Sequence, residues 1–318
     1  MRILSCVNGL LWVNTVWCAT LEVGSGKNFT TITDAYTQAA EGDTILLSAG
    51  TYNEKLEIKK NNITMKGPTF PSMDPAANQA TITAATFARD VKNNDASATL
   101  LVTGSSFSLY NINIANTAGS GNDSQAVALS NKGCQNAFYA ASVLGYQDTL
   151  YAHSGTSFYG SCYVEGAVDF VFGIDGQAWF QGTKLAVLKK KGTVTAQGRT
   201  KEGMGMIVFD SAKIIAGPTA ELGSAGTNFL GRPLGNYSQT VFQNCNLGGV
   251  IAAEGWEEFR KGQDTTNVLA GEFANSVMNM NGTRVAFASM LSKAVPMGDV
   301  LPGYQSWVDE RFLGVGAP

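Results

Sequence analysis

The sequence predicts an all-β solenoid, in which short strands stack in successive coils around one core. Strand-like segments of three to six residues recur along most of the chain, and Gly, Asn, Asp or Ser separate them. Similar strand phrases return roughly every 20 to 28 residues, a spacing typical of repeat architectures. The 36 glycines suit a chain that turns often, because glycine adopts positive φ without steric cost. From spacing alone, a sandwich or a propeller remains an alternative.

The first expected element is a short helix over residues 31–40. Thr31 and Asp34 resemble a capping box, Ile32 and Ala35 lie on one helical face, and Gly42 is the expected stop. We expect this helix to cover one end of the core. The clearest strand patterns follow at residues 44–48, 56–58, 62–65, 99–103, 109–114, 137–143, 162–165, 178–181 and 205–209.

The last part of the chain changes character. Helix-like periodicity is expected over residues 283–294, and a tail containing Gly and Pro then packs against the outside of the body. No linker-like tract interrupts the chain, so we predict one domain over residues 20–318. The formal net charge is -3 and no basic patch stands out, so a nucleic-acid partner is not expected.

Residues 1–19 resemble a secretory signal peptide: Arg2 precedes a short apolar run that ends near Ala19. A buried first strand is the alternative, and the run is too short for a membrane span. Five Asn-X-Ser/Thr sequons are compatible with a secreted glycoprotein; they begin at Asn28, Asn62, Asn122, Asn236 and Asn281.

Three cysteines would remain after signal removal: Cys134, Cys162 and Cys245. The first two are 28 residues apart, which is about one coil. Stacking of these two side chains, or a disulfide between them, is therefore a geometric hypothesis.

The chain lacks the residues that several known hydrolytic mechanisms require. His153 is the only histidine, there is no Gly-X-Ser-X-Gly elbow, and no His/Cys cluster has zinc spacing. We expect His153 to be a loop residue. Carboxylates are therefore the remaining candidates for the catalytic residues.

Two aspartates have a spacing that suits a shared site. Asp148 and Asp169 are 21 residues apart, close to the coil period, which places their carboxylates on neighbouring coils of one face. Gln125 and Gln147 are 22 residues apart and can join the same column. Arg232 is the candidate cation. Paired carboxylates beside apolar groups have pKa values that move apart, one raised by burial and like charge.

These residues lie in segments that resemble the pectin methylesterase family. The matching segments are 50–54 (Gly-Thr-Tyr-Asn-Glu), 125–129, 147–151, 169–173 and 230–233, in the family's order. The similarity runs from about residue 23 to 256 and more loosely to 287. It implies a single-stranded right-handed parallel β-helix and hydrolysis of methyl esters of pectin, with release of methanol. It also implies a secreted enzyme that acts on the cell wall without metal or cofactor.

The resemblance implies a role for each polar residue. Asp169 is the nucleophile, and Asp148 is first the general acid and then the general base. The side-chain amides of Gln125 and Gln147 hold the oxyanion. Arg232 orients Asp169 through charge-assisted hydrogen bonds.

The sugar cleft departs from the family pattern at one position. Leu234 stands where the family usually has Trp after Arg-Pro. Trp256 resembles the second aromatic residue of the cleft, and Tyr151 and Phe170 are further candidates, with core packing equally plausible for both.

Three functions are weighed. The first is an esterase on methylated homogalacturonan, acting as a monomer. The second is a non-catalytic polysaccharide-binding β-helix, which Leu234 suggests and the retained aspartates oppose. The third is a depolymerising β-helix enzyme, either a polygalacturonase or a pectate lyase. The Asn-Thr-Asp and Gly-His-Gly segments of polygalacturonases do not occur in the chain, and a lyase would usually need carboxylates that bind calcium. Whether an inhibitor protein binds the cleft is left open.

Overall fold

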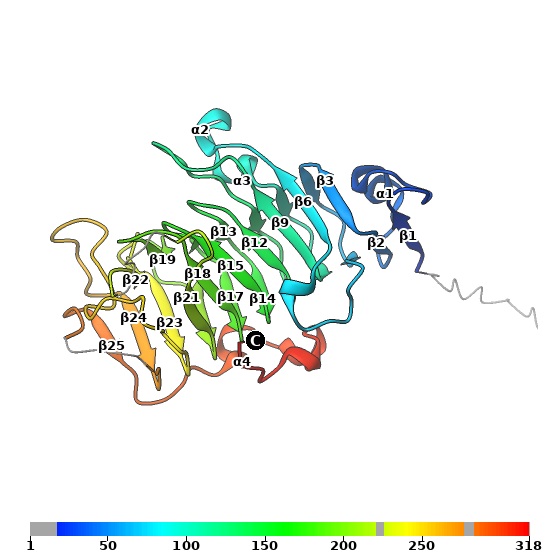
Figure 1. Cartoon of the computed structure of the whole chain (residues 1–318). Helices are drawn as coiled ribbons and strands as arrows, with labels where there is room; N and C mark the ends of the chain where they lie inside the picture. The colour runs from blue at the N-terminus through cyan, green and yellow to red at the C-terminus, as the bar shows by residue number, and fades with distance from the viewer. Residues whose placement is uncertain (1–17, 221–225, 277–282, 318) are drawn as a thin grey trace, which may run out of the picture.

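The chain forms a parallel β-helix, as the sequence predicts. The computed structural model describes residues 18–220, 226–276 and 283–317. Three sheets run along the molecule, and every pairing between their strands is parallel within this part of the chain (Figure 1). From β2 to β22 the chain visits the three sheets in turn, so each coil adds one strand to each sheet.

We name the sheets I, II and III in the order in which a coil enters them. Sheet I has eleven strands: β1 (Thr20–Val23), β2 (Thr44–Leu47), β5 (Thr64–Lys66), β8 (Ser108–Tyr110), β11 (Asn136–Tyr139), β14 (Thr156–Gly160), β17 (Gln177–Gln181), β20 (Met206–Asp210), β23 (Gln239–Gln243), β24 (Leu269–Phe273) and β25 (Ala288–Met290). Sheet II has seven: β3 (Gly50–Asn53), β6 (Ala80–Ala84), β9 (Ile112–Asn116), β12 (Ser142–Leu144), β15 (Tyr163–Gly166), β18 (Lys184–Val187) and β21 (Lys213–Ala216). Sheet III also has seven: β4 (Leu56–Ile58), β7 (Leu100–Val102), β10 (Leu129–Asn131), β13 (Leu150–Ala152), β16 (Val171–Gly173), β19 (Thr193–Gln197) and β22 (Phe229–Gly231).

The corner between sheets I and II is a single residue in the left-handed region. The same conformation recurs coil after coil, at Asn111, Ala140, Ser161, Gly182, Ser211, Asn244 and Ala274. Residues 109–114 and 137–143, each expected to form one strand, are therefore split in two by Asn111 (φ 54°) and Ala140 (φ 45°). The turn re-aims the chain without a loop, because one left-handed residue is enough to change the strand direction.

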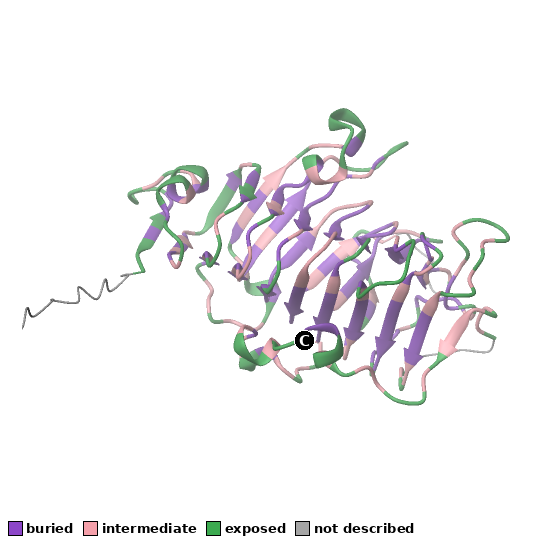
Figure 2. Ribbon diagram, turned by 180° about the vertical axis from the view of Figure 1, so that it is seen from behind, coloured by how far each residue is buried: buried purple, intermediate pink, exposed green. Residues whose placement is uncertain are grey.

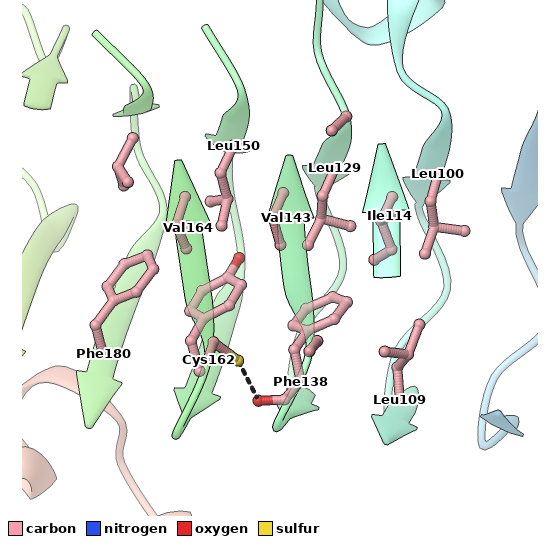
Figure 3. Close-up of a cluster of buried hydrophobic side chains, with 14 of the residues drawn as sticks. Leu100, Leu109, Ile114, Leu129, Phe138, Val143, Leu150, Cys162, Val164 and Phe180 are labelled. Carbon is pink, nitrogen blue, oxygen red and sulfur yellow. Dashed lines mark hydrogen bonds between the residues drawn. The ribbon is translucent and has the colours of Figure 1, made fainter. Parts of the chain in front are cut away.

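Most strands of the solenoid are buried along much of their length (Figure 2), and their inward side chains form a column along the axis. Leu100, Leu129 and Leu150 lie in register on neighbouring strands of sheet III (Figure 3). An aromatic ladder fills the sheet I side, with stacked centroids 4.3 Å apart between Tyr159 and Phe180 and 4.6 Å between Phe180 and Phe209. These distances match the spacing of hydrogen-bonded strands, about 4.8 Å, so in-register aromatic residues stack directly.

Short helices cover the ends and edges. α1 (Ile32–Gln38) begins after Thr31, whose side chain accepts from the Asp34 N–H, and it packs against β1 and β2 at the N-terminal end as expected. The helix ends before Gly42, at Gln38. α2 (Ala88–Val91) and α3 (Asn94–Ser97) lie between β6 and β7, and the 3₁₀ turn η1 (Pro75–Ala77) lies before β6.

The C-terminal segment packs on the outer face of sheet I, as predicted. It contains α4 (Met297–Val300), η2 (Tyr304–Ser306) and η3 (Glu310–Phe312), and it closes a second apolar cluster over Tyr139, Phe158 and Trp179. The helix expected over residues 283–294 is wrong: this stretch holds β25, the last strand of sheet I, because pairing with β24 overrides the helical periodicity.

The cysteine hypothesis is also wrong. Cys134 is exposed, whereas Cys162 is buried in the core, and both are free thiols. The Cys162 thiol donates to the Phe138 carbonyl at 3.3 Å (Figure 3). The predicted signal peptide falls almost wholly on residues 1–17, outside the described residues. In the described part of the chain, none of the helices has the length and apolar character needed to cross a bilayer.

Candidate active site

The two predicted aspartates lie side by side at the start of adjacent strands of sheet III. Asp148 precedes β13 and Asp169 precedes β16. The flanking residues pair in register, Gln147 with Val168 and Leu150 with Val171, so the aspartates also oppose each other across the two coils. Both have left-handed backbones, with φ of 60° and 50°, and each is 8% exposed. The turn therefore presents two nearly buried carboxyl groups about one strand spacing apart.

Asp169 is held by three side-chain donors. Arg232 reaches it with two hydrogen bonds, Nε to Oδ1 at 2.9 Å and a terminal nitrogen to Oδ2 at 2.7 Å. The Thr193 hydroxyl donates to Oδ1 at 2.5 Å and accepts the Asp169 backbone N–H at 3.0 Å. A bidentate guanidinium pair fixes both the charge and the orientation of a carboxylate. Thr193 carries no signal in the sequence, because its role depends on strand register alone.

Asp148 has the opposite environment. Burial first, and then the negative charge of Asp169, raise the pKa of its carboxyl to about 8, while Arg232 opposes the rise. Desolvation and a like charge both favour the neutral acid. The pair thus contains one carboxylate fixed by a cation and one carboxyl that keeps its proton at neutral pH.

The two glutamines stack in one column beside the aspartates. Gln125 and Gln147 form a parallel bridge, and both are half-buried. The Ser124 hydroxyl donates to Gln147 Oε1 at 2.8 Å, which leaves the amide nitrogen of Gln147 to donate elsewhere. The Gln125 carbonyl accepts the Ala88 N–H at 2.8 Å, and this bond ties the start of α2 to the site.

Aromatic rings continue the outer face of sheet III. Tyr151 and Phe172 lie in register and stack at 4.0 Å with an interplanar angle of 8°. His153 stacks on the other side of Tyr151 at 4.4 Å, and its Nδ1 lies 3.1 Å from Asp95 Oδ2. Phe172 was missed from the sequence, although it follows Tyr151 by the same 21 residues that separate the aspartates.

Two predicted cleft residues belong to the core instead. Phe170 is fully buried in the main cluster, where its ring leaves no room for a side chain at Gly166. Trp256 is 2% exposed, donates from its indole N–H to Glu272 Oε1 at 3.1 Å, and packs edge-on against Phe242. Both rings face inward. The path of each coil decides which side of the sheet a side chain occupies, and the local sequence does not encode that path.

Leu234 is exposed, as a cleft residue must be, with an exposed fraction of 42%. It lines a hollow together with Phe259, which sequence analysis did not single out. The Arg232 guanidinium lies 5.0 Å from the centre of the Phe259 ring, so this ring borders the dyad. Glu257 is a third carboxyl nearby: burial raises its pKa, Arg232 opposes the rise, and Asp169 adds to it.

Among the described residues, no group of three or more His, Cys, Asp or Glu side chains is arranged to hold a metal ion. The polar side chains gathered at the site are two carboxyls, two amides, one hydroxyl and one guanidinium.

Comparisons with known proteins identify the family of this chain. The pectinesterase family model matches residues 19–295, which is most of the chain. The chain belongs to the pectinesterase family. A pectinesterase from Aspergillus aculeatus is 35% identical over 300 residues, covering 91% of this chain and 90% of its relative. A pectinesterase from Aspergillus niger is 33% identical, covering 91% and 90%.

Solved structures of the family agree in fold. A pectin methylesterase from Aspergillus niger superposes with a TM-score of 0.85 and 32% identity, covering 92% of this chain and 97% of that one. The carrot enzyme gives a TM-score of 0.81 with 29% identity, covering 92% of this chain and 96% of that one. A pectin methylesterase solved in complex with a hexasaccharide is 26% identical, with a TM-score of 0.70 and coverage of 89% and 97%.

Proposed function

We propose that this pectinesterase hydrolyses the methyl esters of homogalacturonan through an aspartyl acyl-enzyme. The observation that carries the proposal is the divided environment of the two adjacent aspartates. Asp169 lies against Arg232 and Thr193, whereas Asp148 has a pKa raised to about 8 by burial. Nucleophile and acid are therefore distinguished before the substrate binds.

In the first step, an Asp169 carboxylate oxygen attacks the ester carbonyl carbon. The carbonyl oxygen becomes an oxyanion, which the side-chain amides of Gln125 and Gln147 stabilise. When the tetrahedral intermediate collapses, the bond to the methoxy oxygen breaks and Asp148 gives its proton to that oxygen. Methanol leaves, and Asp169 is joined to the galacturonate as a mixed anhydride.

In the second step, a water molecule attacks the anhydride carbonyl. Asp148, now ionised, takes one proton from the water and so returns to its neutral form. The bond to Asp169 breaks and the galacturonate leaves as a free acid. Arg232 keeps the departing Asp169 carboxylate in position for the next cycle, through its two hydrogen bonds.

The aromatic stack of Tyr151 and Phe172 is proposed as part of the sugar platform. It lies on the outer face of sheet III, on the strands that begin just after the two aspartates. Pyranose rings present C–H groups on their faces, and aromatic planes favour such contacts. We further propose that residues 1–19 are a signal peptide, that the domain spans 20–318, and that a secreted monomer acts on cell-wall pectin.

Methanol release from highly methylated pectin tests the proposal. Asp169→Asn keeps the shape and suits a left-handed backbone, but it removes the nucleophilic charge, so we expect a loss of at least about 10³-fold. Asp123→Asn is a matched control, because Asp123 is also left-handed (φ 48°) but exposed. Equal release by Asp169→Asn and wild type would reject the assignment.

A non-catalytic pectin-binding function is the second candidate, because Leu234 replaces an expected aromatic residue in the cleft. Pectin binding by a wild-type protein that releases no methanol would favour it. Loss of viscosity without methanol release would instead indicate a depolymerising enzyme.

A further inference from the structure

The segment that carries Gln125 is not held by regular strand pairing. Residues 125–128 precede β10 and lie outside the ladder of sheet III. On one side they meet the next coil through the bridge between Gln125 and Gln147. On the other side Ala88, the first residue of α2, donates its N–H to the Gln125 carbonyl at 2.8 Å. The position of Gln125 therefore depends on how residues 86–97, which contain α2 and α3, are fixed.

One buried amide joins both ends of this helical segment to the chain beside Gln125. Asn116, the last residue of β9, is 4% exposed. Its Nδ2 donates to the carbonyls of Thr86 at 3.0 Å, Ser97 at 3.1 Å and Val127 at 2.9 Å. Thr86 stands before α2, Ser97 is the last residue of α3, and Val127 follows Gln125 by two residues. We call the Asn116 amide and these three carbonyls the Asn116 clamp.

Further hydrogen bonds complete the clamp. Asn116 Oδ1 accepts the Thr86 N–H at 3.3 Å and the Ala118 N–H at 3.2 Å. The Ser97 hydroxyl accepts the Val127 N–H at 3.1 Å, so side chains bind both backbone polar groups of Val127. Ser97 and Val127 are fully buried. Loss of the Asn116 amide would remove a donor from carbonyls that water does not readily reach, and the segment would have to shift to satisfy them.

We propose that Asn116 is a positioning residue for the oxyanion site, because the clamp fixes the backbone around Gln125 and thereby the place of its side-chain amide. The inference rests on the proposed function, in which that amide donates to the oxyanion. The hydrogen bonds of the clamp all join backbone groups, so Asn116 acts through Gln125. An oxyanion donor stabilises the transition state only from the correct place, and a displacement of about 1 Å can cost about 10²-fold in rate.

A double-mutant cycle on methanol release measures this dependence. We expect Asn116→Ala to lower kcat about 10- to 100-fold and to change KM by less than about threefold. In the Gln125→Ala background, Asn116→Ala should lower kcat by less than about twofold, because the amide that it positions is already gone. The full loss in both backgrounds would overturn the proposal, since a general structural defect does not depend on Gln125.

Asn136→Ala is the matched control. Asn136 is a fully buried asparagine at the start of β11, in sheet I, and its side chain also binds the backbone. It accepts the Phe107 N–H at 2.9 Å and donates to the Gly104 carbonyl at 2.9 Å. Asn116→Ala and Asn136→Ala should both lower the melting temperature, but Asn136→Ala should keep the kcat of wild type. An equal fall of kcat in the two variants would contradict the proposal.

Ser97→Ala is the milder variant, for the case that Asn116→Ala does not fold. It removes the hydroxyl that holds the Val127 N–H and leaves the Asn116 amide in place. We expect the same pattern at smaller size, with kcat lowered in the wild-type background and nearly unchanged in the Gln125→Ala background. Equal losses in both backgrounds would again reject the clamp as a positioning device.

Hydrogen exchange tests the clamp without turnover. Backbone amides in residues 125–128 should exchange at least about tenfold faster in Asn116→Ala than in wild type, and at the wild-type rate in Asn136→Ala. Unchanged exchange of residues 125–128 in Asn116→Ala would overturn the proposal. A wild type that releases no methanol would reject the esterase function instead, and hydrogen exchange would still decide whether Asn116 holds the Gln125 segment.

Discussion

Asp148 and Asp169 are the same residue type one coil apart, yet their surroundings differ. Three donors contact the Asp169 carboxylate, whereas no described side chain donates to Asp148. The spacing of 21 residues predicted the pair, because a solenoid repeats its register. The sequence could not predict Thr193, which meets Asp169 only because β16 pairs with β19.

In the proposed mechanism, the pH dependence of the reaction follows from Asp148. Its carboxyl would have to hold a proton for methanol to leave, and burial raises its pKa to about 8. We expect kcat to fall above about pH 8, where this acid ionises. A kcat profile between pH 5 and 10 checks this. A rate that keeps rising well beyond pH 9 would show that methoxide departs without this proton.

Asp148 should also cost stability. Its folded pKa of about 8 lies above the unfolded value of about 3.9, so the folded state holds the extra proton between these limits. The free energy of unfolding therefore decreases as pH rises from about 4 to 8. Asp148→Asn removes the titration, and we expect it to stabilise the protein by several kcal/mol at pH 8 and by little at pH 4.

Urea unfolding of both proteins at the two pH values measures this difference. Asp123→Asn, which changes an exposed left-handed aspartate, serves as the control. An Asp148→Asn protein no more stable than wild type at pH 8 would mean that this carboxyl is not strained by burial.

At the scale of the element, the corner residue between sheets I and II explains where strand prediction failed. The segments 109–114 and 137–143 have continuous strand composition, but Asn111 and Ala140 turn each of them through a left-handed residue. Asparagine at such a corner is readable from the sequence, because it tolerates this conformation. An alanine corner cannot be read from the sequence, because only the stacked coils above and below require the chain to turn there.

Ala274 has the same left-handed conformation, with φ of 49°, but its side chain is exposed. Glycine adopts this conformation without the steric cost of a Cβ atom, which is roughly 1–2 kcal/mol. We expect Ala274→Gly to raise the free energy of unfolding by about 0.5–1 kcal/mol.

Ala118→Gly is the contrasting variant, because Ala118 is not left-handed and the change should be neutral or destabilising. Thermal melts of both variants suffice for the comparison. Destabilisation by both would indicate that the methyl group of Ala274 packs more than its exposure suggests.

At the scale of the whole molecule, one solenoid has two separate surfaces. The dyad lies on the outer face of sheet III, and the C-terminal segment covers the outer face of sheet I. The solenoid and its order of coils were predictable from spaced motifs. The division of inner and outer residues was not, so Phe170 and Trp256 were assigned to a cleft while Phe172 and Phe259 were overlooked.

Phe312 anchors the C-terminal segment, with its ring 4.7 Å from that of Tyr139 and only 1% of it exposed. We expect Phe312→Ala to lower the free energy of unfolding by about 3–5 kcal/mol, the usual cost of removing a buried aromatic ring. Methanol release at room temperature should change little, because the dyad lies on another sheet.

The exposed Met290 provides the control, Met290→Ala, which should leave stability unchanged within about 0.5 kcal/mol. Urea unfolding of both variants, followed by activity assays, separates the two surfaces. A large loss of activity in Phe312→Ala protein that is still folded would show that a change on sheet I affects the site on sheet III.

The separation of the two aspartates is the rise of one coil. The hydrogen bonds between β13 and β16 set this separation, rather than any side chain, and such bonds are repeated in the coils above and below. A distance that the hydrogen bonds of a sheet fix does not vary as a loop conformation varies, and no closing motion is needed to form it. We expect the enzyme to keep its full rate up to the temperature at which the coils separate. Activity and folded structure should then be lost at the same temperature.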